Sequence, residues 1–267
     1  MGSLALYLRY ARVSLRALMI YPNSFLLGLA GNFTANAVEF VGVWALFARF
    51  KHVLGWNFVD VALFYGMINM SFSIADVTTR GFDVFGTHFV RTGDFDRLLL
   101  RPRSTPLQLM GYEVRLSGIG RGLQGLIVFL LAVSLVRRSW SAIDVLVLTW
   151  TIVGGVALFT GILVFQATLA FWTVESLEIA NTLTYGGVEA GQYPLNIYAA
   201  WFRRFLLFIV PIGCVSYLPL AALLGHADVT GVPAAVAELA PAVSFVFLGL
   251  ALSAWRVGVA HYTSTGS

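Results

Sequence analysis

The stretch RTGDFDRLLLRPRSTP, residues 91–106, is dense in charge and lies between two long apolar segments. Asp94 is expected to cap a helix, and Pro102 ends that helix, because the residue before a proline is pushed out of the α region. A helix over residues 95–100 is about 10 Å long, given the rise per residue of an α-helix. This is far too short to cross a bilayer. We predict a short helix held outside the membrane by the apolar segments on either side.

The side chains of this short helix divide between two faces. Phe95, Leu98 and Leu99 share one face by their i, i+3, i+4 spacing, while Asp96 and Arg97 lie off it. Such a helix is either an amphipathic peg held out of the membrane or an ordinary cytoplasmic loop. In the second case its basic residues follow from the positive-inside rule and its leucines lie on the lipid headgroups. The pattern alone leaves both interpretations open.

Composition places the whole chain in a membrane. Of its 267 residues 58% are hydrophobic and 11% are charged, whereas a soluble domain carries about a quarter charged residues. Cys214 is the only cysteine, so no intramolecular disulfide forms. Three arginines, Arg9, Arg12 and Arg16, precede the first long apolar run, which argues against a signal peptide.

Apolar runs predict six transmembrane helices: residues 24–47, 58–79, 116–136, 143–172, 202–224 and 241–260. Within residues 1–22, an apolar stripe opposite three arginines predicts an amphipathic helix lying in the membrane interface. Residues 173–200 are polar and rich in glycine, and they are expected to form a second loop on the side of residues 91–106. The predicted fold is therefore all-α, with one transmembrane domain over residues 1–267.

The basic residues predict the orientation. If the N-terminus is cytoplasmic, only Arg49, Lys51, Arg137 and Arg138 lie outside, and the other thirteen of the 17 basic residues lie inside. Because basic residues are enriched in cytoplasmic loops, both termini are expected in the cytoplasm. The segments 91–106 and 173–200 then face the cytoplasm as well.

Motifs for catalysis and for cofactors are absent from the sequence. There is no G-x-x-x-x-G-K-S/T phosphate loop, so the chain has no such means of holding ATP. The four histidines are widely separated and form no H-E-x-x-H pair, so no metal site is indicated. The arginines cluster at membrane boundaries, and nothing requires nucleic acid. We predict no catalytic, cofactor-binding or metal-binding residue.

Polar side chains recur at helical spacing within two predicted spans. They are Asn32, Asn36 and Glu39 in the first span, and Asn69, Ser73, Asp76 and Arg80 in the second. Acids facing lipid are costly, so the stripes should face protein or a wet cavity. The alternatives are a translocation path and hydrogen bonds between helices. Asp76 is expected to pair with Arg80, one turn away.

Two motifs resemble one family. GDFDRLLLRPRSTPLQL, residues 93–109, looks like the loop between the second and third helices of ABC-2-type transporter permeases, in the subfamily of about 260 residues and six helices. NTLTYGGVEAGQYPLNIYAAWFRRFLLFIVPIGCVSYLPLAALLG, residues 181–225, resembles that subfamily's link from helix four through helix five. Family members often have an aromatic near Ala190 and a proline near Ala200, and this chain departs from both.

The resemblance implies a permease that pairs with a second permease, identical or related, and with two separate ATPase subunits that hold ATP and Mg. The short helix then resembles the coupling helix that seats on the ATPase, through Phe95, Asp96, Arg97, Leu98, Leu99 and Arg101. The second loop would act as a contact or gate, through Glu175, Glu178, Tyr185, Gln192 and Tyr193. The translocation path would be lined by Asn32, Asn36, Glu39, Asn69 and Ser73. Such systems are generally exporters, and the arginine-rich composition suggests the plasma membrane of a bacterium.

Two other classes of protein are considered. A proton-coupled secondary transporter could use Glu39 and Asp76, but it would usually have more spans and an internal repeat. A non-transporting membrane scaffold would need no polar stripes. The sequence does not identify a substrate: the acids of the second loop suggest cationic amphiphiles, but Arg203 and Arg204 stand beside them.

Overall fold

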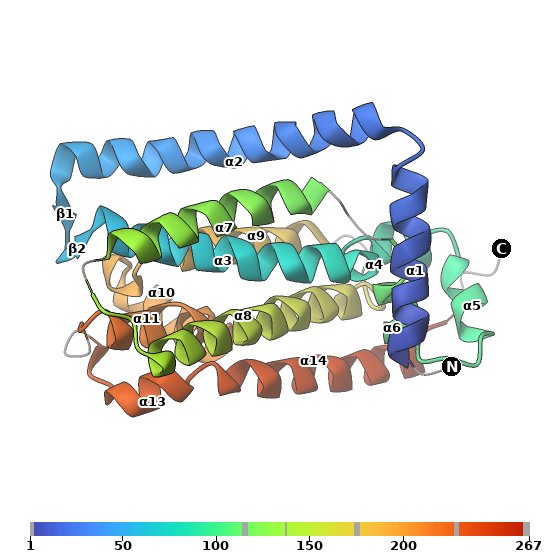
Figure 1. The fold of residues 1–267 in the computed structure, drawn as a ribbon. Helices are drawn as coiled ribbons and strands as arrows, with labels where there is room; N and C mark the ends of the chain where they lie inside the picture. The colour runs from blue at the N-terminus through green and yellow to red at the C-terminus, as the bar shows by residue number, and fades with distance from the viewer. Residues whose placement is uncertain (1–2, 114–116, 137, 174–176, 227–229, 264–267) are drawn as a thin grey trace.

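The computed structural model describes residues 3–113, 117–136, 138–173, 177–226 and 230–263. Five described helices are long and apolar enough to cross a membrane, and they run side by side (Figure 1). They are α2 (Pro22–Phe50), α3 (Phe58–Thr78), α7 (Ser117–Leu135), α8 (Ala142–Leu169) and α14 (Ala242–His261), the last preceded by α13 (Ala234–Leu239). The prediction of an all-α membrane protein is confirmed, and these helices match every predicted span except 202–224.

The two ends of the bundle differ. One end, which we call the α5 end, carries α4 (Arg80–Asp83), the π-helical segment η1 (Phe85–Val90), α5 (Asp94–Leu99) and α6 (Thr105–Met110). The opposite end, which we call the hairpin end, carries the antiparallel strands β1 (His52–Val53) and β2 (Trp56–Asn57). Helix α1 (Ser3–Leu18) lies across the α5 end rather than along the spans (Figure 1). This is the placement expected of an interfacial helix.

The connection between α2 and α3 is fixed by local geometry. Leu54 and Gly55 have positive φ angles of 49° and 90°, which turn the chain between the two strands. Asn57 and Asp60 form a reciprocal capping box at the start of α3. Trp56 is buried, and its Nε1 donates a hydrogen bond to Asn196 Oδ1 at 3.0 Å. The hairpin end is therefore tied to a segment far along the chain.

The segment 173–200, expected to be a loop, contains the helix α9 (Leu177–Gly191), which runs antiparallel to α3 inside the bundle. The ring of Tyr185 lies 5.7 Å from that of Phe72 on α3, and Asn196 lies at Trp56. The chain therefore passes from the α5 end to the hairpin end along α9 and the following residues. The loop prediction was wrong because α9 is too polar to be recognised as a span by hydropathy.

The predicted span 202–224 is also wrong, because this segment enters the bundle and returns to the end at which it began. It consists of α10 (Ala200–Arg204), the π-helical η3 (Phe205–Ile209), the 3₁₀ helix η4 (Ile212–Val215) and α11 (Tyr217–Leu223), with a bend of 74° between the two halves. Trp56, at the hairpin end, contacts both Asn196 before this segment and His226 after it, the latter with ring centroids 4.3 Å apart. We call the segment from α10 to α11 the re-entrant pair.

Close approach of backbones holds neighbouring spans together. A Cβ added to Gly66 of α3 would lie 2.7 Å from the Phe129 nitrogen and 2.8 Å from the Gly125 oxygen of α7. A Cβ added to Gly161 of α8 would lie 2.9 Å from the Phe247 ring of α14. Small residues that permit such contact are typical of packing between membrane helices.

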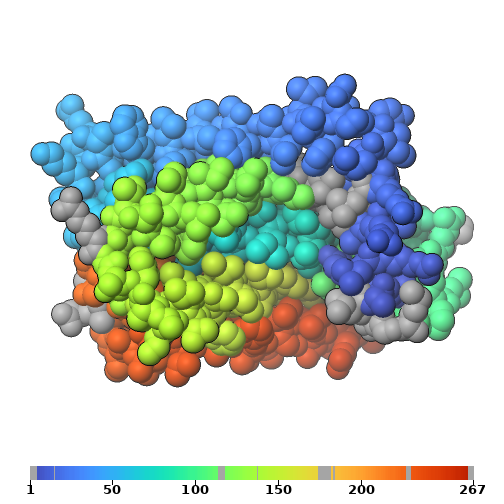
Figure 2. Space-filling view, in the orientation of Figure 1, coloured from blue at the N-terminus to red at the C-terminus, as the bar shows by residue number. Residues whose placement is uncertain are grey.

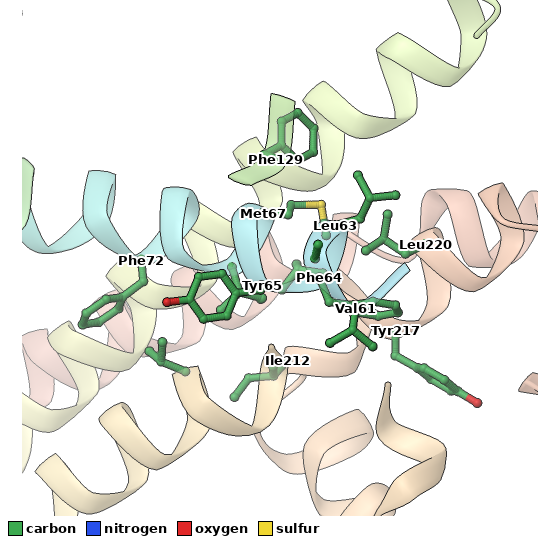
Figure 3. Close-up of a cluster of buried hydrophobic side chains, with 14 of the residues drawn as sticks. Val61, Leu63, Phe64, Tyr65, Met67, Phe72, Phe129, Ile212, Tyr217 and Leu220 are labelled. Carbon is green, nitrogen blue, oxygen red and sulfur yellow. The ribbon is translucent and has the colours of Figure 1, made fainter. Parts of the chain in front are cut away.

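Helix α3 lies at the centre of the bundle. Its Leu63, Phe64 and Met67 are fully buried, between Phe129 of α7 and residues of the re-entrant pair such as Leu220 (Figure 3). Helix α2, by contrast, lies along the edge of the molecule beside α7 and has most of its surface exposed (Figure 2). Apolar residues stand on every side of α3 beside its polar stripe, as is typical of a helix buried on all sides.

Candidate functional site

Helix α5 projects from the bundle as the sequence predicts, but its start differs. The residue before the helix is Gly93, with a φ of 75°, and Asp94 is already the first helical residue. A left-handed φ is costly for residues with a side chain, so glycine suits this position. Asp94 instead forms an exposed ion pair with Arg97 at 3.3 Å. The predicted cap at Asp94 is therefore replaced by a glycine turn.

Phe95 is the anchor of α5. It is fully buried, and its ring packs against Phe85 at 5.0 Å, Phe171 at 5.5 Å and Tyr262 at 5.0 Å between centroids. Phe171 follows α8 and Tyr262 follows α14, so Phe95 links α5 to the ends of two spans. Burial and the neighbouring Asp96 carboxylate raise the pKa of Tyr262, so its hydroxyl stays neutral.

This burial corrects the predicted docking face. Phe95 and Leu98, with 0% and 7% exposure, face the chain's own aromatic cluster and cannot contact a partner in this arrangement. The exposed side chains are Arg97, Leu99 and Arg101, together with Leu100 at 86% exposure. Leu100 was missed because it lies off the apolar stripe of the isolated helix. We call these four exposed residues the α5 tip.

The chain after α5 is held in place by side chains. Gln108 Nε2 donates hydrogen bonds to the carbonyl oxygens of Leu98 at 3.1 Å and Arg103 at 3.0 Å. Trp255 Nε1 of α14 donates to Thr105 Oγ1 at 3.0 Å. The segment after α5 is therefore tied to α5 itself and to α14.

The polar stripe of α2 divides into different environments. Asn32 is exposed, and its Nδ2 donates to the Gly28 carbonyl of its own helix at 2.9 Å. Asn36 is buried, and its Oδ1 accepts a hydrogen bond from Arg121 Nε of α7 at 3.0 Å. The Tyr65 hydroxyl of α3 donates to the Asn36 carbonyl at 3.0 Å. Asn36 is thus the point where α2, α3 and α7 meet.

Glu39, one turn further along α2, faces α9. Its carboxyl lies within hydrogen-bonding reach of the Glu189 carboxyl and the Gln192 amide, and within electrostatic range of the Arg121 guanidinium. We call Glu39, Arg121, Glu189 and Gln192 the carboxyl cluster. The sequence singled out Glu39, but it could not bring Glu189 to it, because α9 was taken for a loop.

The polar residues of α3 lie in its contact with α7. Asn69 Nδ2 donates to the Tyr65 carbonyl at 2.9 Å, and Ser73 Oγ donates to the Gly118 carbonyl at 2.7 Å. Both side chains are buried. Arg80 forms an ion pair with Asp83, not with Asp76 as expected, because Asp83 lies one turn further along the short helix α4. These are contacts between and within helices.

Of the residues assigned to a cytoplasmic gate, those that the structure describes lie on a helix or in the turn after it. Tyr185 lies on α9 inside the bundle, and Gln192 and Tyr193 follow α9 directly, with Gln192 buried. Glu175 lies outside the described residues, and so does the side chain of Glu178. Among the described residues, no group of three or more histidine, cysteine or acidic side chains could hold a metal ion.

Comparison with known proteins gives one match. Residues 33–266 match the family described as ABC-2 family transporter protein. No curated protein and no solved structure matches the chain. The family match covers both the α5 tip and the carboxyl cluster.

Proposed function

Because the chain belongs to the ABC-2 family of transporter proteins, we propose that it is the permease subunit of an ATP-driven exporter in the plasma membrane of a bacterium. It forms half of the translocation pathway and pairs with a second permease, identical or related. ATP and Mg belong to two separate ATPase subunits. Both termini and the α5 end face the cytoplasm.

The observation that carries this proposal is the construction of α5. Its exposed tip stands on a buried anchor, Phe95, which contacts residues that follow α8 and α14. A partner that seats on Leu99 and Leu100 can therefore move two spans through one rigid contact. Interior packing is dense and transmits displacement. An ordinary loop on the headgroups would need no such anchor.

The pathway is proposed along the side of α2 that faces α9. Glu39 and Glu189 present polar atoms there, next to the buried Asn36, and Glu189 is exposed although it lies in a helix within the bundle. An acid exposed to hydrocarbon costs several kcal/mol by typical scales. This cost is avoided if water or a second permease covers Glu189. Asn69 and Ser73 do not line this side, and they support the pathway through the packing of α3 against α7.

The proposal is tested by placing a photo-crosslinking amino acid at Leu100 in the cell. The matched control is Leu54, which is 64% exposed at the hairpin end. We expect Leu100 to crosslink to a protein that carries a G-x-x-x-x-G-K-S/T phosphate loop, and Leu54 to give no such adduct. A lack of this adduct at Leu100, or the same adduct at Leu54, would contradict the coupling role.

A proton-coupled secondary transporter is the second candidate, because Glu39 and Glu189 form a carboxyl pair of the kind that carries protons. The two candidates differ in energy source. If the chain is a secondary transporter, the purified chain alone in liposomes should transport its substrate when a pH gradient is applied, without ATP. We expect no such transport without the ATPase subunits.

A further inference from the structure

The carboxyl cluster is unbalanced in charge. Glu39 and Glu189 carry two negative charges when both are ionised, and Arg121 supplies one positive charge. The other described titratable groups facing the pair are Tyr65 of α3 and, after α9, Tyr193 and Tyr198, and all three are neutral phenols unless they lose a proton. The cluster is therefore neutral only when it holds one more positive charge. Uncompensated charge inside a membrane protein is costly.

An unused hydrogen-bond acceptor lies beside this carboxyl pair. Gln192 is 1% exposed and lies against Glu39, and its Oε1 has no hydrogen-bond partner in the described part of the chain. A buried acceptor without a partner costs about 1–3 kcal/mol. The oxygens around the pair thus favour a ligand that carries hydrogen-bond donors or positive charge.

The surroundings favour an organic cation over a metal ion. Among the described residues only Glu39 and Glu189 contribute carboxyl groups to the cluster, whereas metal sites in proteins usually take more protein ligands. Tyr193 and Tyr65 lie within electrostatic range of both carboxyl groups. Aromatic rings beside carboxylates attract ammonium groups through both charge and ring quadrupole. Glu189 is exposed at the surface of the chain, so a ligand can reach its carboxyl group.

We propose that Glu39 and Glu189 together form a recognition site for one organic ammonium group, which replaces a proton that the pair otherwise holds. The substrate class is amphiphilic amines, with the ammonium at the carboxyl pair and the apolar body along α2 and α9. On binding, the proton leaves to water, and the charge of the cluster stays balanced. This inference rests on the proposed export function and names its substrate class.

Binding is tested on the purified full chain in nanodiscs of phosphatidylcholine, by the fluorescence anisotropy of rhodamine 6G, a lipophilic cation. Fluorescein, an anion with the same tricyclic core, is the control probe. We expect Glu39→Gln and Glu189→Gln each to weaken rhodamine binding by about tenfold or more. Glu238→Gln, on α13 and away from the cluster, should bind as the unaltered chain does. Glu189→Asp keeps the charge and should keep most of the binding.

The dependence on pH is the second readout. Because proton and cation compete for the pair, affinity in the unaltered chain should fall as the pH is lowered, by up to about tenfold per pH unit. In either glutamine variant the remaining carboxylate is balanced by Arg121, so binding should be weak and independent of pH. The proposal would be overturned if the glutamine variants bound rhodamine 6G as tightly as the unaltered chain does. It would also be overturned if Glu189→Asp lost as much affinity as Glu189→Gln, or if the unaltered chain bound fluorescein as tightly as rhodamine 6G. No ATPase is present in this experiment, so its failure leaves the crosslinking result at Leu100 unaffected.

Discussion

Replacing Phe95 with alanine tests whether α5 is held by its buried anchor. The Phe95 ring is fully buried and packs against four aromatic rings, at centroid distances from 5.0 Å to 6.2 Å. Truncating such a side chain costs about 3–5 kcal/mol. If this cost falls on the local docking of α5, the population of the undocked state rises by roughly a hundredfold to several thousandfold.

Trypsin measures that population, because Arg97 lies on α5 with an exposed side chain. Cleavage after Arg97 requires local unfolding of the helix, so its rate should rise by at least about a hundredfold in Phe95→Ala. Mass spectrometry of the fragments identifies this cut among others. Phe95→Leu, which keeps an apolar side chain, should restore most of the protection.

Leu100→Ala is the matched control, since Leu100 is 86% exposed and has little burial to lose. Its cleavage rate should equal that of the unaltered chain. Equal cleavage of Phe95→Ala and the unaltered chain would refute the anchor, and faster cleavage of Leu100→Ala alone would show that the tip itself holds the segment.

Three further predictions concern the bundle. Gly66→Ala should lower the Tm in detergent, at a cost of about 1–3 kcal/mol, because the new methyl group meets the α7 backbone. The control Gly28→Ala, whose methyl group has nothing within 4 Å, should not lower the Tm. A cysteine at Ala199 should be labelled by an impermeant thiol reagent outside intact cells and one at Thr92 only after permeabilisation. Labelling of both from the same side would contradict the course of α9, and the reverse pattern would contradict the proposed orientation. Trp56→Phe should lower the free energy of unfolding by about 0.5–1.5 kcal/mol, because the hydrogen bond from the indole N–H to Asn196 is lost. An unchanged Tm would exclude this contribution.

The sequence by itself determined the class of protein and much of its framework. Long apolar runs need a bilayer to be stable, so α2, α3, α7, α8 and α14 could be located from composition alone. The short helix in residues 91–106 followed from charge density and from Pro102. The family resemblance, first carried by two motifs, agrees with the match over residues 33–266.

Only the tertiary structure decided the course of residues 177–224. Hydropathy took the polar α9 for a loop and the apolar re-entrant pair for a span, because it measures the affinity of a segment for lipid and not its neighbours. Helix α9 can be polar since its side chains meet those of α2 and α3 inside the bundle. The re-entrant pair is apolar since it packs within the same core without crossing it.

The same limit applies to single residues. The spacing of Phe95 and Leu98 correctly gave one apolar face, but the face turns inward, because the ends of α8 and α14 supply aromatic partners that the isolated helix lacks. Glu39 could be singled out as an acid within a span, whereas its neighbour Glu189 depends on the fold of a distant helix. Periodicity identifies a face, and only packing between distant segments decides what that face meets.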